Sequence, residues 1–128
     1  MVIPPIFRGN DKAIEALRLA DLYTKNAYYE LVNETDASDV SITLKRKRVR
    51  EAARAVLPNM TETQIVVTAN HRALLEFFAK RGNIHADLEI RELACRMFTI
   101  AKDVAPNIYQ SLETFNDVDG YESIYENT

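Results

Sequence analysis

The sequence is poor in the residues that build disulfide frameworks and metal centres. It has 128 residues, of which one is cysteine, two are histidine and none is tryptophan. One cysteine excludes an internal disulfide and any zinc site built on paired cysteines. Two histidines leave few ligands for other metals, so the sequence predicts no metal. Glycine and proline, at 3 and 4 residues, are too few for a collagen-like or low-complexity chain.

Long apolar runs and a strong net charge are also lacking. No stretch reaches the about 18 apolar residues of a transmembrane helix, and the first residues lack the basic and apolar regions of a signal peptide. We therefore expect a cytoplasmic protein with no membrane partner. A formal net charge of −3 argues against a general nucleic-acid binder, whereas 47% hydrophobic residues allow a folded core. The length predicts a single domain, or part of one, over 1–128.

Helical spacing dominates the pattern of apolar residues, and the expected fold class is α+β, predominantly helical, with about five helices and one or two short strands. Helices are predicted over about 12–33, 41–56, 71–81 and 85–103, with a short last one that Pro106 opens and that extends to Phe115. The β-branched run 63–68 predicts one strand. Because the backbone groups of a lone strand need partners, another chain or a missing segment must supply a second strand.

The segments between and beyond these helices are predicted from their composition. Residues 1–9, with two adjacent prolines, indicate an extended arm. Residues 33–41 are polar and predict a loop. The end of the chain, 116–128, is acidic and is expected to be a mobile tail.

Basic residues cluster in the second predicted helix. Arg46, Arg50 and Arg54 follow one another at a spacing of four, which places three guanidinium groups on one face. Because like charges on one face repel, a bound anion is one explanation of this stripe, and a solvated face is the other. Arg54 stands just before an apolar pair, so we expect its side chain to be partly sheltered and to bind a carboxylate or a phosphate.

Polar residues also gather at both ends of the third predicted helix. Asn70, His71 and Arg72 fall at its start, where free amides suit an anionic or polar ligand, although Asn70 alone is better explained as a helix cap. Arg81 falls at its end, where a cation complements the helix dipole. His85 either caps the next helix or lies on the surface.

The residues by themselves assemble no recognisable enzyme site. Arg91 is expected to pair on the surface with Asp87 or Glu89, and the chain has no P-loop, no GxGxxG and no HExxH motif. Without further comparison, the sequence predicts a mostly helical protein with an anion-binding surface.

Residues 44–94 resemble the C-terminal half of flavin-dependent thymidylate synthases, most closely the actinobacterial and actinophage members. The family pattern runs AR-x-VLP-N, then T-x-N-x-R, then HA-x-x-EIR-x-LA, and this chain has ARAVLPN, TANHR and HADLEIRELA in the same order. Residues 1–40 and 95–115 fit more loosely, as flanking helices. The fold implied is therefore the C-terminal half of this enzyme.

The resemblance implies an activity, its cofactors and its partners. Enzymes of this family methylate deoxyuridylate (dUMP) to dTMP, with methylenetetrahydrofolate as carbon donor, FAD as hydride relay and NADPH as reductant. Their sites form where the subunits of a homotetramer meet. The implied partners are thus dUMP, a folate and further subunits or a separate N-terminal half, with no nucleic acid.

The resemblance also implies roles for single residues. Arg54 matches an arginine that binds dUMP from a neighbouring subunit. Arg81 matches the arginine at the pyrimidine ring, which is a catalytic and a dUMP-binding position because a cation there favours ionisation of the ring. Five residues match positions that contact FAD, and at the fourth of them an acid replaces the usual Asn or His: Asn70, His71, Arg72, Glu76 and His85.

One family motif is missing, because RHRxxSxNxxSxR, which belongs to the N-terminal half, is not in the chain. Three functions remain open. The chain is part of a flavin-dependent thymidylate synthase that works with its other half, or a truncated, non-catalytic homologue that binds a nucleotide or serves as an interaction module. The third alternative is a helical protein whose basic stripe binds nucleic acid, which the net acidity disfavours.

Overall fold

The computed structural model describes residues 1–33 and 42–127, which form two compact units, Met1–Gln64 and Ile65–Thr128. We call them the N-terminal and the C-terminal unit. The chain is α+β and predominantly helical, as predicted, with four helices and a two-stranded sheet among the described residues. None of these helices is long and apolar enough to cross a membrane. Beyond Asn33, the predicted loop 33–41 lies outside the described residues.

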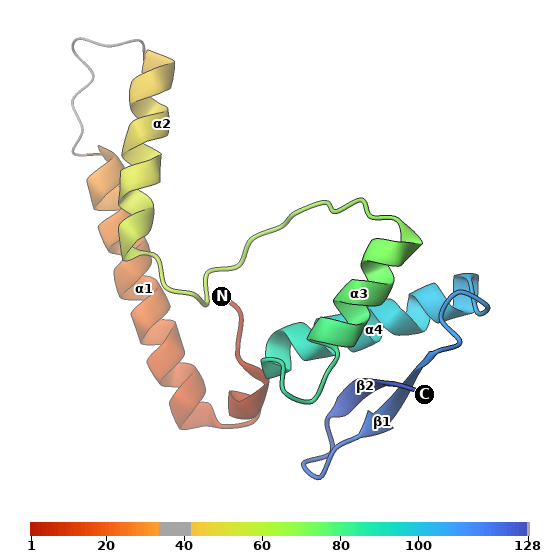
Figure 1. The fold of residues 1–128 in the computed structure, drawn as a ribbon. Helices are drawn as coiled ribbons and strands as arrows, with labels where there is room; N and C mark the ends of the chain where they lie inside the picture. The colour runs from red at the N-terminus through yellow and green to blue at the C-terminus, as the bar shows by residue number, and fades with distance from the viewer. Residues whose placement is uncertain (34–41, 128) are drawn as a thin grey trace. The chain divides into compact units, whose positions relative to one another are not determined.

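The N-terminal unit is a helical hairpin. Its helices α1 (Asp11–Asn33) and α2 (Ile42–Ala53) lie side by side, and the short 3-10 helix η2 (Arg54–Val56) continues α2 (Figure 1). These elements confirm the first two predicted helices. The amide of Ala13 donates to Oδ1 of Asn10 over 3.1 Å, so Asn10 caps α1.

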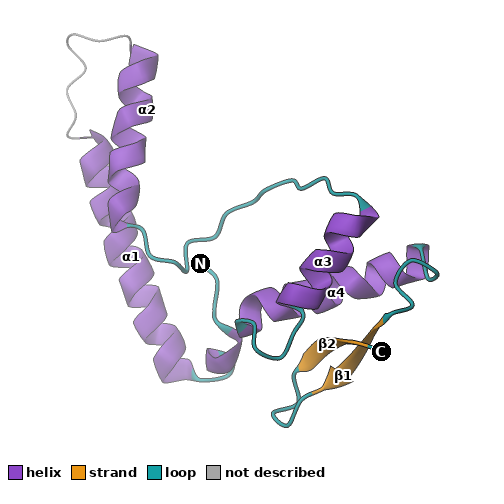
Figure 2. Cartoon of the chain, viewed as in Figure 1, coloured by secondary structure: helices purple, strands orange, loops and turns teal. Residues whose placement is uncertain are grey.

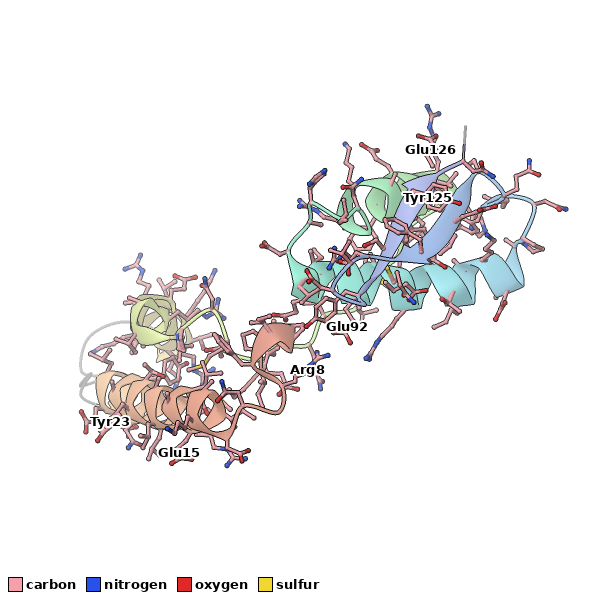
Figure 3. All side chains as sticks on the ribbon, turned by 90° about the horizontal axis from the view of Figure 1, so that it is seen from below. Arg8, Glu15, Tyr23, Glu92, Tyr125 and Glu126 are labelled. Carbon is pink, nitrogen blue, oxygen red and sulfur yellow. The ribbon has the colours of Figure 1, made fainter. Side chains whose placement is uncertain are left out.

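Much of α1 is exposed. None of its residues is buried, and Glu15 and Tyr23 project from it (Figure 3). The segment before it is not fully extended, because a 3-10 turn, η1 (Pro5–Phe7), interrupts the predicted arm. Proline has the backbone angle that the start of such a turn requires.

The C-terminal unit packs two helices against a β-hairpin. Helices α3 (His71–Arg81) and α4 (Leu88–Val104) confirm the third and fourth predictions, and the strands β1 (Leu112–Asn116) and β2 (Glu122–Glu126) pair antiparallel (Figure 2). The buried core draws on both helices, both strands and the loop before β1. It consists of Phe78, Cys95, Phe98, Tyr109, Leu112 and Ile124.

The strand predicted over 63–68 is wrong for this chain. The segment is irregular, and its apolar side chains are exposed, at 78% for Ile65 and 99% for Val66. No backbone hydrogen bond from this segment reaches any residue that the structure describes. A β-branched sequence favours a strand only when a neighbouring strand is available to pair with it.

The predicted last helix is also wrong, because the hairpin replaces it. Oδ1 of Asp117 accepts hydrogen bonds from the amides of Asp119 and Tyr121, and Gly120 has a φ of 82°. This turn chemistry joins two strands rather than ending a helix. It also corrects the expectation of a mobile tail over 116–128, because β2 buries Ile124 in the core.

Candidate functional site

In the N-terminal unit, the basic stripe lines an open groove along α2 and η2. The groove measures about 620 Å³ and is lined by Thr43, Arg46, Lys47, Arg50, Glu51 and Arg54. The three arginines predicted to share a face do so, because positions four apart stack along one side of a helix.

The three arginines of this groove form no ion pair with the carboxylates that the structure describes, although Glu51 also lines the groove. Lys47 lies 3.8 Å from Glu51, but within the described residues Arg46, Arg50 and Arg54 form no ion pair. Arg54 is exposed, contrary to the predicted shelter, because the chain at this point buries Ala53 instead. The groove therefore offers three accessible cations, which suits a ligand with several negative oxygens.

In the C-terminal unit, Asn70 caps α3 and leaves other donors open. Its Oδ1 accepts from the amide of Ala73 over 2.9 Å. The amides of His71 and Arg72 have no partner among the described residues. These amides lie at the positive end of the helix dipole, so the corner Asn70–Arg72 can bind an anionic or polar group.

His71 is tied to the core although its own side chain is exposed. Its Nδ1 lies 2.8 Å from the hydroxyl of Tyr109, and the two rings meet edge to face with centroids 5.7 Å apart. Tyr109 is fully buried, and burial raises the pKa of its hydroxyl. The composition around His71 gave no sign of this contact, since the partner lies in the segment predicted as a helix.

Glu76, the acid at a flavin-contact position, is engaged within α3. It lies one turn from Lys80, and their oxygen and nitrogen are 2.5 Å apart. The hydrogen bond from Lys80 lowers the pKa of Glu76, and the nearby charge of Arg72 acts in the same direction. The carboxylate is therefore ionised at neutral pH and partly offset by two cations.

Arg81 and His85 flank the tight loop that follows α3. Ile124 donates its amide to the carbonyl of Gly82 over 2.7 Å, and a Cβ at Gly82 would lie 2.5 Å from Cδ1 of Ile124. Only glycine allows β2 to approach the helix end so closely. Asn83 accepts the amide of His85, and both Arg81 and His85 stay exposed. His85 does not cap α4, which begins after Asp87.

Arg91 fixes the same loop from the inside, a role that the sequence did not reveal. It is buried, at 5% exposure, and donates to the carbonyl of Ile84 over 3.1 Å. Its other partner is Asp117, at 3.0 Å, and not the predicted Asp87 or Glu89. Burial raises the pKa of Asp117, but hydrogen bonds from backbone amides and the charge of Arg91 outweigh it, so the pKa is lowered.

The residues matched to FAD and dUMP positions thus lie along α3, just past it, and in the N-terminal unit. Asn70, His71 and Arg72 lie at the start of α3, and Arg81 ends the helix, about 15 Å away for a helix of this length. Glu76 lies between them on α3, and His85 lies in the loop beyond Arg81. Arg54 belongs to the groove of the N-terminal unit. All are accessible to a ligand, and the two groups in the C-terminal unit are held by contacts to its core.

Comparison with known proteins identifies similar sequences over most of the chain. A family model described as "Thymidylate synthase complementing protein" matches residues 1–107. The flavin-dependent thymidylate synthase of Mycobacteroides abscessus is 41% identical over 125 residues, which are 95% of this chain and 50% of that protein. The enzyme of Corynebacterium diphtheriae is 42% identical over 118 residues, 89% of this chain and 46% of that protein.

The similarity covers a part of these enzymes only, because the chain spans about half the length of the curated relatives that it matches. A third relative, the flavin-dependent thymidylate synthase of Mycolicibacterium vanbaalenii, is 42% identical over 125 residues, which are 95% of this chain and 50% of that protein. Both the identity and the extent of the match are high enough to decide the family, and the chain belongs to the flavin-dependent thymidylate synthases.

Proposed function

We propose that this chain forms part of an enzyme that methylates dUMP to dTMP with methylenetetrahydrofolate, FAD and NADPH. The proposal rests on the exposure and the free hydrogen-bond donors of the matched positions. Asn70, His71 and Arg72 surround open amides at a helix start, and Arg81 is exposed without an ion-pair partner among the described residues.

The groove of the N-terminal unit is proposed to bind the phosphate of dUMP. Arg54 matches a dUMP-binding position of the family, and Arg46 and Arg50 add two cations on the same face. A guanidinium group offers paired donors that fit the oxygens of a phosphate. Anion binding would also relieve the repulsion among the three arginines.

Arg81 is proposed to act at the pyrimidine ring. A pyrimidine ring that gives up a ring N–H proton carries negative charge, and a cation beside it lowers the energy of that state. The close contact of Gly82 with β2 and the bond from Arg91 to the following loop hold the helix end that carries Arg81. These contacts hold the backbone from which the Arg81 side chain extends.

The corner Asn70–Arg72 is proposed to hold FAD, which relays the hydride when bound. The donors there fit a flavin nucleotide, because its phosphates and ring carbonyls are acceptors. Glu76 is an acceptor at a further matched position, and its bond to Lys80 reduces its repulsion of a phosphate. His85, in the loop that follows α3, would lie near the flavin ring.

The remaining half of the enzyme is proposed to come from a partner. A second polypeptide with the RHRxxSxNxxSxR motif, further copies of this chain, or both would complete the sites, as in the homotetramers of the family. We call the part of the Mycobacteroides abscessus synthase that this chain does not match the complementing half.

The test is dTMP formation by the chain mixed with the complementing half, FAD, NADPH, methylenetetrahydrofolate and dUMP. We expect dTMP with the unchanged chain and a large loss with Arg81→Lys, because a point charge does not replace a planar guanidinium. Arg96→Lys, on the exposed side of α4, is the matched control and should retain activity. No dTMP from a formed complex would contradict catalysis and favour the non-catalytic alternative.

A further inference from the structure

The contact between Tyr109 and His71 links the core of the C-terminal unit to the corner Asn70–Arg72. Tyr109 is 0% exposed and packs edge to face against Phe78 and Phe98, with centroids 5.6 and 6.2 Å away. Its hydroxyl lies 2.8 Å from Nδ1 of His71, the first residue of α3. Among the described residues, His71 is the hydroxyl's hydrogen-bond partner.

The chemistry of the two groups sets the direction of this hydrogen bond. Burial raises the pKa of Tyr109, so its hydroxyl keeps its proton at neutral pH. A buried hydroxyl without an acceptor loses its hydrogen bond, and Nδ1 is the acceptor within reach. A neutral imidazole that accepts at Nδ1 carries its proton on Nε2, at the opposite side of the ring.

We propose that Tyr109 is a positioning residue that holds His71 in the Nε2–H tautomer, so that the exposed side of the ring presents a fixed donor to an acceptor oxygen of the flavin nucleotide. This inference rests on the proposed function for its ligand, but the tautomer itself does not. Nε2–H joins the open amides of His71 and Arg72 and the guanidinium of Arg72, all donors on one corner. A phosphate or carbonyl oxygen is the complement of such a set.

The first test is nitrogen NMR of the histidine side chains in the full, ligand-free chain. The chain has two histidines, so His85, which is exposed, serves as an internal reference for His71. We expect Nδ1 of His71 to be unprotonated and coupled to the hydroxyl proton of Tyr109. A protonated Nδ1 in the neutral ring, or a tautomer ratio equal to that of His85, would overturn the proposal without any variant.

Tyr109→Phe removes the hydroxyl and keeps the ring that packs in the core. We expect the coupling to vanish and the Nδ1–H tautomer of His71 to appear. Tyr125→Phe is the matched control, because the hydroxyl of Tyr125 bonds Glu113 on the surface of the same unit. It should leave the signals of His71 unchanged, and the same tautomer ratio in a folded Tyr109→Phe chain as in the unchanged chain would overturn the proposal.

The second test measures FAD affinity in the complex with the complementing half. We expect Tyr109→Phe to weaken FAD binding by roughly 2- to 10-fold, the range of one neutral hydrogen bond, and Tyr125→Phe to leave it unchanged. Equal affinity for Tyr109→Phe and the unchanged chain would overturn the role in ligand binding. A complex that binds no FAD at all, with the His71 tautomer as expected, would contradict the proposed function and leave the positioning of His71 intact.

Discussion

At the scale of single residues, Arg91 shows how one side chain organises the surroundings of the site. Its guanidinium reaches the carbonyl of Ile84, the carboxylate of Asp117 and the ring of Tyr121, whose centroid is 5.9 Å away. It thus joins the loop that carries His85 to the hairpin turn. The sequence placed Arg91 on the surface, because a partner one helical turn away is the default for an arginine.

The hydrogen bonds that Asp117 accepts from the amides of Tyr121 and Asp119, together with its ion pair with Arg91, lower its pKa and make the stability of the C-terminal unit depend on pH. The folded pKa of Asp117 lies below the unfolded value of about 3.9. Its contribution is therefore fully present above that value and is lost as the pH falls through the lower folded pKa. We expect Asp117→Asn to lower the free energy of unfolding at neutral pH and to remove part of the acid sensitivity below about pH 4.

Urea unfolding of the full chain at several pH values, followed by near-ultraviolet circular dichroism, measures both effects. Asp119→Asn is the matched control, because its side chain is exposed in the same turn. It should leave the pH dependence nearly unchanged. Identical pH profiles for Asp117→Asn and the unchanged chain would contradict the role of the buried pair.

Arg54 carries a residue-scale prediction for substrate binding. If its guanidinium binds the phosphate of dUMP, Arg54→Ala should weaken the affinity of the complex for dUMP by roughly 1.5–3 kcal/mol, the range for a charged hydrogen bond. Calorimetric titration of dUMP measures this. Arg48→Ala is the control, since Arg48 is also exposed on α2 but does not line the groove. If Arg54→Ala and Arg48→Ala weakened dUMP binding equally, Arg54 would contribute only a general electrostatic attraction and no specific contact to the phosphate.

At the scale of elements, the sequence predicted the helices well and the sheet badly. The starts of α1 and α3 were predictable, because Asn10 and Asn70 cap them by local bonds that their side chains allow. Proline favours the first position of a helix, so the sequence predicts a helix start at Pro106. The hairpin that follows depends on the turn at Asp117–Gly120 and on packing against α4, a tertiary contact that no local pattern encodes.

The prediction at this scale concerns residues 65–68, part of the segment expected to be a strand. Its β-branched side chains are exposed and its backbone pairs with no residue that the structure describes, which favours pairing with another strand once one is supplied. We expect its amides to exchange hydrogen rapidly in the chain alone and slowly in the complex with the complementing half. Mass-spectrometric hydrogen exchange measures this, with the interior of α3 as the reference, which should be protected in both samples.

Two outcomes of that exchange experiment differ clearly. Protection of Ile65–Thr68 together with complex formation supports a strand partner in the complementing half. Rapid exchange of the same amides within a formed complex would contradict it, because a paired strand shields its amides from water.

At the scale of the whole molecule, the candidate site residues belong to two units of the chain. Arg54 lies in the N-terminal unit and Arg81 in the C-terminal one, and the chain spans half the length of its relatives. The resemblance of residues 44–94 predicted the family, and the positions that it assigns to FAD and dUMP stay predictions. It did not predict the contact of Tyr109, which belongs to none of the family motifs, or the buried partners of Arg91, which is a motif residue without an expected role.

We propose that this chain supplies an FAD site to a thymidylate synthase, and the visible absorbance of the reconstituted complex tests this. The chain is mixed with the complementing half, FAD and dUMP, and free ligand is removed by size exclusion. We predict a complex that retains flavin absorbance, and less flavin when Arg72→Ala replaces the unchanged chain. A colourless complex, or two halves that elute separately, would contradict the claim.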